Sequence, residues 1–300
     1  ISGAFFKYEL DSVESNAFYT ANRFGRGGLG TIYVYAAGNS GDIGDDVNYT
    51  GYPKEMTTIA VAALNDLGQR ASYSTFGAAT VISAPAGLDA TRFQGTTTTD
   101  VQGTNGYNPV FNFPPGQYAD LDYNAFFNGT SSAAPLTTGV IALILDANPN
   151  LGWRDVQEII MRSASLTDPT HFDWYTNDAG FHFNHEFGAG IINASDAVTM
   201  AETWSNLSLR TNILESATGL QGLVTDTMPF IHTFGISNNN FRVEHAQLRV
   251  DITHPIRGDL QITLTSPSGT QSILARTHGD VNPNYNNYTF NTVRNWGEFA

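Results

Sequence analysis

Residues 128–135 read NGTSSAAP and place hydroxyl groups among glycine and alanine, just before the apolar run LTTGVIALILDA. A hydroxyl at the start of a helix can cap it by accepting a hydrogen bond from a main-chain N–H, and Thr130 and Ser131 are candidates. It can also act as a nucleophile, because small neighbours admit a substrate carbonyl and a helix N-terminus stabilises the negative charge that develops during attack. This segment alone leaves both roles open.

A second candidate is Asn39, in residues 36–41 (AAGNSG), which follow a predicted buried strand. In open α/β sheets, ligands bind beyond the carboxyl ends of strands. Asparagine tolerates the left-handed conformation of a turn, so Asn39 could have a purely local role. A rigidly held side-chain amide is also a good hydrogen-bond donor to an oxyanion.

Apolar periodicity predicts the elements that must position these residues. Helices are expected at residues 12–22, 131–146, 153–164 and 194–204, and buried strands at residues 31–37, 57–64 and 80–85. Ser12 is the expected cap of the first helix. Helices combined with buried apolar strands are typical of a parallel α/β sheet.

Two glycine-containing stretches separate these elements. Residues 25–30 (GRGGLG) precede a strand and do not open a helix, which excludes a dinucleotide-binding or phosphate-binding loop. Residues 87–127 are rich in turn-forming residues and predict a long loop. Its part from Val101 to Tyr123 lies just before Ser131 and could border the substrate cleft, contact another domain or be a surface elaboration.

The pattern changes after Trp204. Short alternating runs at residues 245–252, 259–265 and 271–275 are separated by turn signals and predict antiparallel strands. A domain boundary is therefore expected near residue 205, which divides the chain into residues 1–204 and 205–300.

Composition excludes several classes of protein. The 300 residues include 14 Lys and Arg against 28 Asp and Glu, and the net charge of −14 argues against a nucleic-acid partner. There is no cysteine, which excludes disulfides within the chain, a thiol nucleophile and a zinc–thiolate site. No apolar run reaches about 18 residues, so no membrane span is expected. The chain begins with neither Met nor a basic leader, and we expect it to be part of a longer protein.

The segments AAGNSG, YSTFG, APAG and NGTSSAAP, in this order, resemble the subtilisin-like serine proteases. The resemblance implies that Ser131 is the nucleophile and Asn39 an oxyanion donor. GRGGLGTIYVYAAGNSG, NYTGYP and HEFGAGIINASDAV are similar to the kexin and furin branch, the proprotein convertases. RVEHAQLRVDITHPIRGDLQITLTSPSGTQSIL resembles the P domain that follows the catalytic domain there. The implied fold is part of a subtilisin-like parallel α/β sheet with flanking helices, followed by part of an all-β, jelly-roll or sandwich P domain that stabilises its neighbour.

The sequence departs from this family in its catalytic partners. The family's catalytic Asp and His precede the asparagine motif, and no such segments precede AAGNSG here, so both are expected upstream of Ile1. All seven histidines follow Ser131. His185 as a base would require an α/β-hydrolase order, but G-x-S-x-G is missing at Ser131, so we interpret His185 as structural.

The acidic residues also differ from the family pattern. Thr50 stands where the convertases have an acid that recognises basic side chains. Asp45 matches a carboxylate that holds calcium in that branch. Thr75 stands at the position where the branch has the glutamate that holds calcium together with this carboxylate. Asp42, Asp45 and Asp46 could gather a hard cation or form a solvated acidic turn.

The resemblance implies a secreted serine endopeptidase that acts through an acyl-enzyme and favours basic residues at the cleavage site. It implies no catalytic cofactor and a structural calcium ion. The expected partners are protein or peptide substrates and a pro-segment or folding chaperone. The alternative is a non-catalytic binding module that kept the fold without its catalytic triad.

Overall fold

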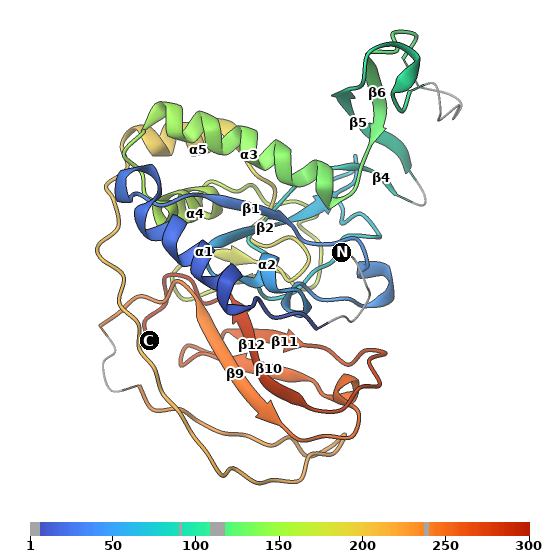
Figure 1. Cartoon of the computed structure of the whole chain (residues 1–300). Coiled ribbons are helices and arrows are strands. Elements are labelled where there is room, and N and C mark those ends of the chain that lie inside the picture. Colours follow the sequence, from blue (N-terminus) through green and yellow to red (C-terminus); the bar gives the residue numbers. More distant parts are fainter. Residues whose placement is uncertain (1–6, 90–91, 109–117, 237–239) are drawn as a thin grey trace.

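The computed structural model describes residues 7–89, 92–108, 118–236 and 240–300. Figure 1 shows an α/β part above, a β-rich part below and a small sheet that projects beside the start of α3. The α/β part contains a parallel sheet with strand order β1-β2-β3, formed by β1 (Tyr33–Ala36), β2 (Thr58–Leu64) and β3 (Ile82–Pro85). The three predicted strands and their parallel arrangement are confirmed, but β1 is half-buried with Tyr35 exposed, and not buried as expected.

The register of this sheet brings the carboxyl ends of its three parallel strands side by side. Ala36 pairs with Val61, and Leu64 pairs with Pro85. Every residue of β2 is buried, as expected for a central parallel strand. The segments that follow these strands therefore lie at the same end of the sheet, beyond the carboxyl ends of the strands, where ligands bind in open α/β folds.

The predicted helices are present with small differences at their ends. They are α1 (Ser12–Phe24), α3 (Thr130–Ala147), α4 (Trp153–Arg162) and α5 (Ala194–Glu202). The short α2 (Gly51–Lys54) was not predicted.

The predicted cap of α1 is wrong by one residue. The cap is Asp11, whose carboxylate accepts hydrogen bonds from the N–H groups of Val13 and Glu14 at 2.8 Å each. The Glu14 carboxylate accepts the Asp11 N–H in return. This reciprocal capping box satisfies more main-chain donors than a single hydroxyl at Ser12 can.

Helix α3 is the central helix of the α/β part. It contacts β2, and Ile141 and Ile144 lie in the main hydrophobic core. Among the described helices, α3 alone is long and apolar enough, by length and composition, to cross a membrane, although the sequence has no uninterrupted apolar run of that length. We assign it as a core helix because its buried face packs on the sheet.

The prediction of a long loop over residues 87–127 is wrong at both ends of the segment. These ends form a three-stranded antiparallel sheet of β4 (Gly87–Asp89), β5 (Arg92–Thr99) and β6 (Tyr123–Phe127), in that order, and residues 109–117 between β5 and β6 lie outside the described residues. The sheet projects from the body of the molecule, and β6 leads into α3 (Figure 1). Its strands consist largely of threonine, asparagine and aromatic residues, so they carry little of the apolar signal that marks a strand in sequence.

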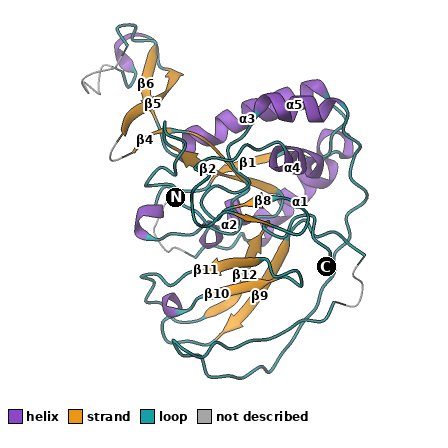
Figure 2. Cartoon of the chain, turned by 180° about the vertical axis from the view of Figure 1, so that it is seen from behind, coloured by secondary structure: helices purple, strands orange, loops and turns teal. Residues whose placement is uncertain are grey.

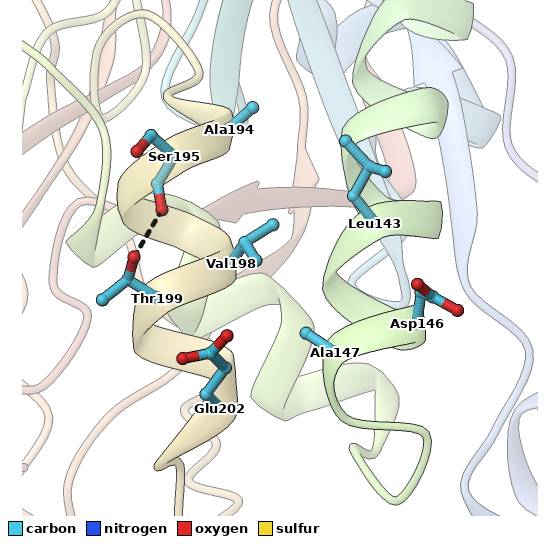
Figure 3. A pocket seen from close by; sticks show the side chains of 8 residues that line it. All are labelled: Leu143, Asp146, Ala147, Ala194, Ser195, Val198, Thr199 and Glu202. Carbon is cyan, nitrogen blue, oxygen red and sulfur yellow. Dashed lines mark hydrogen bonds between the residues drawn. The ribbon is translucent and has the colours of Figure 1, made fainter.

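A groove of about 520 Å³ lies between α3 and α5 (Figure 3). Leu143, Asp146 and Ala147 of α3 face residues of α5 that include Val198 and Glu202. Since α3 rises about 1.5 Å per residue, these positions lie roughly 18 Å along the helix from its first turn. The groove is therefore separate from the start of α3.

The β-rich part consists of two antiparallel strand pairs, seen from behind in Figure 2. The strand β9 (Ala246–Ile252) pairs with β12 (Tyr285–Thr292), and β10 (Ile262–Thr265) pairs with β11 (Gln271–Ala275). Three of these strands were predicted. A further short pair, β7 (Tyr175–Thr176) with β8 (His182–Phe183), belongs to the chain before α5.

The two parts share hydrophobic cores. Val293 and Trp296, which follow β12, are buried in the main core of the α/β part. In return, Tyr49 and Ala78 from the α/β part are buried in the second core, among residues of β11 and β12. Neither part completes its core without the other.

Candidate active site

Ser131 lies in the first turn of α3 and is exposed. The cap residue is Gly129, with a φ of 83°, and no side chain caps the helix. The proposed capping role of Thr130 or Ser131 is therefore wrong. The neighbouring Ser132 is buried, and its Oγ donates a hydrogen bond to Thr96 Oγ1 of β5 at 2.7 Å. The two serines thus have different environments, and only the hydroxyl of Ser131 is open to a substrate.

Asn39 lies beside the start of α3, 92 positions earlier in the chain than Ser131. Its Oδ1 accepts two hydrogen bonds from Thr130, one from the main-chain N–H and one from the hydroxyl, both at 2.9 Å. The Thr130 hydroxyl also accepts the N–H of Gly38 at 3.2 Å. These bonds hold the Oδ1 of the Asn39 side chain in place. They do not involve its Nδ2.

Two hydrogen-bond donors remain at this position. Among the described residues, neither the Nδ2 of Asn39 nor the N–H of Ser131 has a hydrogen-bond acceptor, whereas the N–H groups of Gly129, Thr130 and Ser132 all have one. Unpaired donors at the first turn of a helix are suited to stabilise an oxyanion. The sequence singled out Asn39 but not the N–H of Ser131, because a main-chain donor carries no residue-type signal.

The carboxamide of Asn39 also constrains its neighbour. A Cβ added to Gly129 would lie 3.2 Å from Asn39 Nδ2, at a backbone conformation that side chains rarely adopt. Glycine is therefore required before Thr130 both for its positive φ and for the close approach of the amide.

His185 lies elsewhere, at the junction between the two parts. It is buried, its Nδ1 donates to Asp173 Oδ2 at 2.9 Å, and its Nε2 accepts the N–H of Ile273 in β11 at 3.0 Å. Burial lowers the pKa of His185 to about 4, despite the opposing effect of the Asp173 carboxylate. Both ring nitrogens are used in structural bonds, in agreement with the structural interpretation of His185.

Asp45 as a calcium ligand stays a prediction, and the described residues around it do not gather into a carboxylate cluster. Asp45 and Asp46 are buried, but the Asp46 carboxylate faces the guanidinium of Arg276 at 3.4 Å. Burial raises the pKa of Asp46 to about 7, although Arg276 opposes this shift. Asp42 is exposed, and within the described residues no group of three or more His, Asp or Glu side chains gathers to hold a metal ion.

The positions of Thr50 and Thr75 explain the altered acidic pattern. Thr50 is half-buried and precedes α2. Thr75 is buried, and its hydroxyl accepts the N–H of Ser40 at 3.2 Å. A neutral hydroxyl here binds the backbone next to Asn39, where the resemblance would place a carboxylate.

Comparison with known families agrees with this fold. The Subtilase family model matches residues 8–190, and the Proprotein convertase P-domain model matches residues 243–300. The first match covers more than half of the chain, and the chain belongs to the subtilase family. The matches leave residues 191–242 unassigned, so the boundary near residue 205 stays a prediction.

Curated relatives lie in the proprotein convertase branch. The chain is 35% identical over 288 residues to PC3-like endoprotease variant B of Hydra vulgaris, covering 91% of this chain and 38% of that protein. It is 34% identical over 290 residues to human Proprotein convertase subtilisin/kexin type 7, covering 92% of this chain and 34% of that protein. The chain therefore spans little more than a third of these relatives.

The fold is also found in solved structures. The serine protease of Aeromonas sobria has a TM-score of 0.73 at 22% identity and covers 100% of this chain and 61% of its own. The complex of that protease with the chaperone ORF2 gives a TM-score of 0.74, with the same identity and coverage. At this identity the likeness concerns the fold, which is subtilisin-like with a β-rich P domain.

Proposed function

We propose that the full-length protein is a secreted serine endopeptidase that hydrolyses peptide bonds through an acyl-enzyme. Ser131 Oγ attacks the carbonyl carbon, and its proton passes to a histidine, which then gives it to the leaving amine. Water hydrolyses the resulting ester and releases Ser131. The observation that carries this proposal is the pair of unpaired donors, Asn39 Nδ2 and the Ser131 N–H, beside an exposed serine hydroxyl.

The catalytic histidine and aspartate are proposed to come from a segment that precedes Ile1. None of the seven histidines, all of which the structure describes, hydrogen bonds to Ser131. In the described part of the chain, β1 pairs with β2 alone, and α1 has no fully buried residue. Both elements therefore offer surface on which further strands and helices can pack.

We further propose a preference for Lys or Arg before the scissile bond, weaker than in the convertases. The net charge of −14 and the convertase relatives support a basic substrate. Thr50 weakens the preference because a pocket without an acid leaves a cation poorly compensated. Asp46 is not a substitute, since it is buried against Arg276; the remaining candidates are Asp45 and a carboxylate of the preceding segment.

A chaperone or pro-segment is the proposed folding partner. The Aeromonas sobria protease, which has the same fold, was solved in complex with the chaperone ORF2. The large buried junction between the α/β part and the P domain supports a need for assistance, because its contacts join residues that lie far apart in the chain.

The test uses the full-length protein. A fluorophosphonate reagent should label one serine, and peptide mapping should locate the adduct at Ser131. Matched peptides with Arg, Lys, Leu or Phe before the scissile bond should then be cleaved with the highest kcat/KM for Arg or Lys. Absence of labelling and of hydrolysis would contradict the enzyme and favour a binding module, whereas a clear lead for Leu or Phe would contradict only the basic preference.

A further inference from the structure

The segment from Tyr73 to Thr75, between β2 and β3, contacts both chain segments that form the candidate active site. One of these is the Asn39 loop, which follows β1, and the other is Gly129, which precedes the nucleophile. Neither contact has a role in the acyl transfer described above. Both bind sequence neighbours of the residues that carry the oxyanion donors: Ser40 follows Asn39, and Gly129 lies two positions before Ser131.

Thr75 holds the chain on both sides of Asn39. Its N–H donates to the carbonyl oxygen of Gly38 at 2.9 Å, and its Oγ1 accepts the N–H of Ser40 at 3.2 Å. The residue is 1% exposed, so water does not compete for these bonds. A Cβ on Gly38 would lie 2.8 Å from Thr75 Oγ1, so this close contact also requires glycine there.

Tyr73 holds the other chain segment. Its hydroxyl accepts the N–H of Gly129 at 3.2 Å and donates to the carbonyl oxygen of Gly87 at 2.8 Å, while its ring packs against the main core. Its own carbonyl oxygen accepts the N–H of Gly41 at 2.8 Å. A single short segment is therefore bonded to the Asn39 loop and to the start of α3.

These contacts matter because the donors themselves are not held by packing. Asn39 and Ser131 are exposed, and an oxyanion is stabilised only when its donors are already in place. A displacement of about 1 Å in such a site can lower the rate by roughly a hundredfold. The bonds from Thr75 and Tyr73 are suited to prevent such a displacement.

We propose that Tyr73 and Thr75 are positioning residues that set the distance between Asn39 Nδ2 and the Ser131 N–H. The inference rests on the proposed function, because it concerns the donors of the same acyl transfer. The Asn39 loop is thus held by a neutral hydrogen bond from the Ser40 N–H to the Thr75 hydroxyl.

The experiment compares variants of the full-length enzyme that remove a single hydroxyl. Thr75→Val and Tyr73→Phe should each lower kcat by roughly tenfold to a hundredfold with little change in KM, because the lost alignment acts in the transition state. Thr75→Ser, which restores the hydroxyl, should recover most of kcat. A variant that is only destabilised would have a lower melting temperature, without a selective decrease in kcat at nearly constant KM.

Two buried residues provide matched controls. The hydroxyls of Thr80 and Tyr285 have no hydrogen-bond partner within the described part of the chain, and both residues are buried. Thr80→Val and Tyr285→Phe make the same chemical changes as the test variants and should leave kcat unchanged.

The outcomes separate the inference from the proposed function. In an Asn39→Ala background, Thr75→Val should cost much less than in the wild type, because the donor that it positions is gone. If the wild type is active but Thr75→Val and Tyr73→Phe behave like their controls, the inference is overturned and the protease remains. If the wild type neither hydrolyses peptides nor is labelled at Ser131, the proposed function fails first.

Discussion

Asn39 and Asn48 are nine positions apart and use the same side chain in opposite ways. Asn39 is exposed; its oxygen is bonded to Thr130 and its amide is left without an acceptor among the described residues. Asn48 is fully buried, its Oδ1 accepts the N–H of Asn291, and its Nδ2 donates to the carbonyl oxygen of Leu274. The unpaired Nδ2 of Asn39 is available to a ligand. The Oδ1 and Nδ2 of Asn48 are both bonded to residues of the β-rich part, so this side chain connects the two parts of the molecule.

The contrast extends to the regions around the two residues. At the start of α3 the important groups are exposed and are held by a few hydrogen bonds. At the junction with the P domain, aromatic and polar side chains are buried together: Lys54 donates to the carbonyl oxygen of Thr289 at 2.8 Å, and Trp296 donates to Glu158 at 3.2 Å. Substitutions in the first region should therefore change catalysis and leave stability almost unchanged, and those in the second should do the reverse.

The largest effect is expected at Ser131. In the full-length protein, Ser131→Ala should lower kcat by roughly six orders of magnitude, because the nucleophile is removed, while the melting temperature changes little. Ser132→Ala is the control, since Ser132 is buried and bonded to Thr96. Peptide hydrolysis and thermal unfolding measure the two properties. Retained turnover in Ser131→Ala together with its loss in Ser132→Ala would show that the nucleophile is misassigned.

The next largest effect is expected at Trp296. Its side chain is 1% exposed and lies in the main core of the α/β part. Trp296→Ala should lower the free energy of unfolding by about 3–5 kcal/mol, and kcat per folded molecule should stay close to that of the wild type. Phe172→Ala, at a residue that is 90% exposed, is the control. If denaturant unfolding showed equal stability for the two variants, the P domain would not stabilise its neighbour through this residue.

A smaller effect, which depends on pH, is expected at His185. Its pKa falls from 6.5 to about 4 on folding, so between these values the unfolded chain binds more protons than the folded one. The stabilising contribution of the neutral ring is therefore complete above pH 6.5 and is lost as the pH falls towards 4. It amounts to a few kcal/mol at most.

His185→Gln removes this titration and should reduce the slope of unfolding free energy against pH in that interval. The slope should not vanish, because burial also lowers the pKa of His245, to about 3. Phe172→Ala, at an exposed residue whose side chain does not titrate, is the control and should keep the wild-type slope. Identical slopes for both variants would show that His185 does not couple protonation to the junction.

The sequence predicted those parts of the fold whose signal is apolar and local. The strand β2 and the helix α3 were found because continuous or periodic apolar residues are typical of buried elements. The sheet β4–β6 and the strand β12 were missed because their residues are largely polar or aromatic without clear alternation, and their pairing joins distant segments.

The sequence likewise predicted some residues of the candidate site but not the contacts that hold them. Ser131 and Asn39 were singled out by small neighbours and motif order, and the structure brings their segments together. The bonds from Tyr73 and Thr75 could not be predicted, because nothing in a single sequence indicates which hydroxyl reaches which N–H across the fold. The pairing of Asp46 with Arg276 was missed for the same reason.

The burial of Trp296 and Val293 within the α/β core has a consequence for the order of events during synthesis. A ribosome has released the segments of Asn39 and Ser131 long before these two side chains emerge. Until then the hydrophobic core around α4 lacks the side chains of Val293 and Trp296, so the nascent chain cannot reach its final packing. For the protease proposed above, we therefore expect activity to appear only after β12 and the residues that follow it have folded.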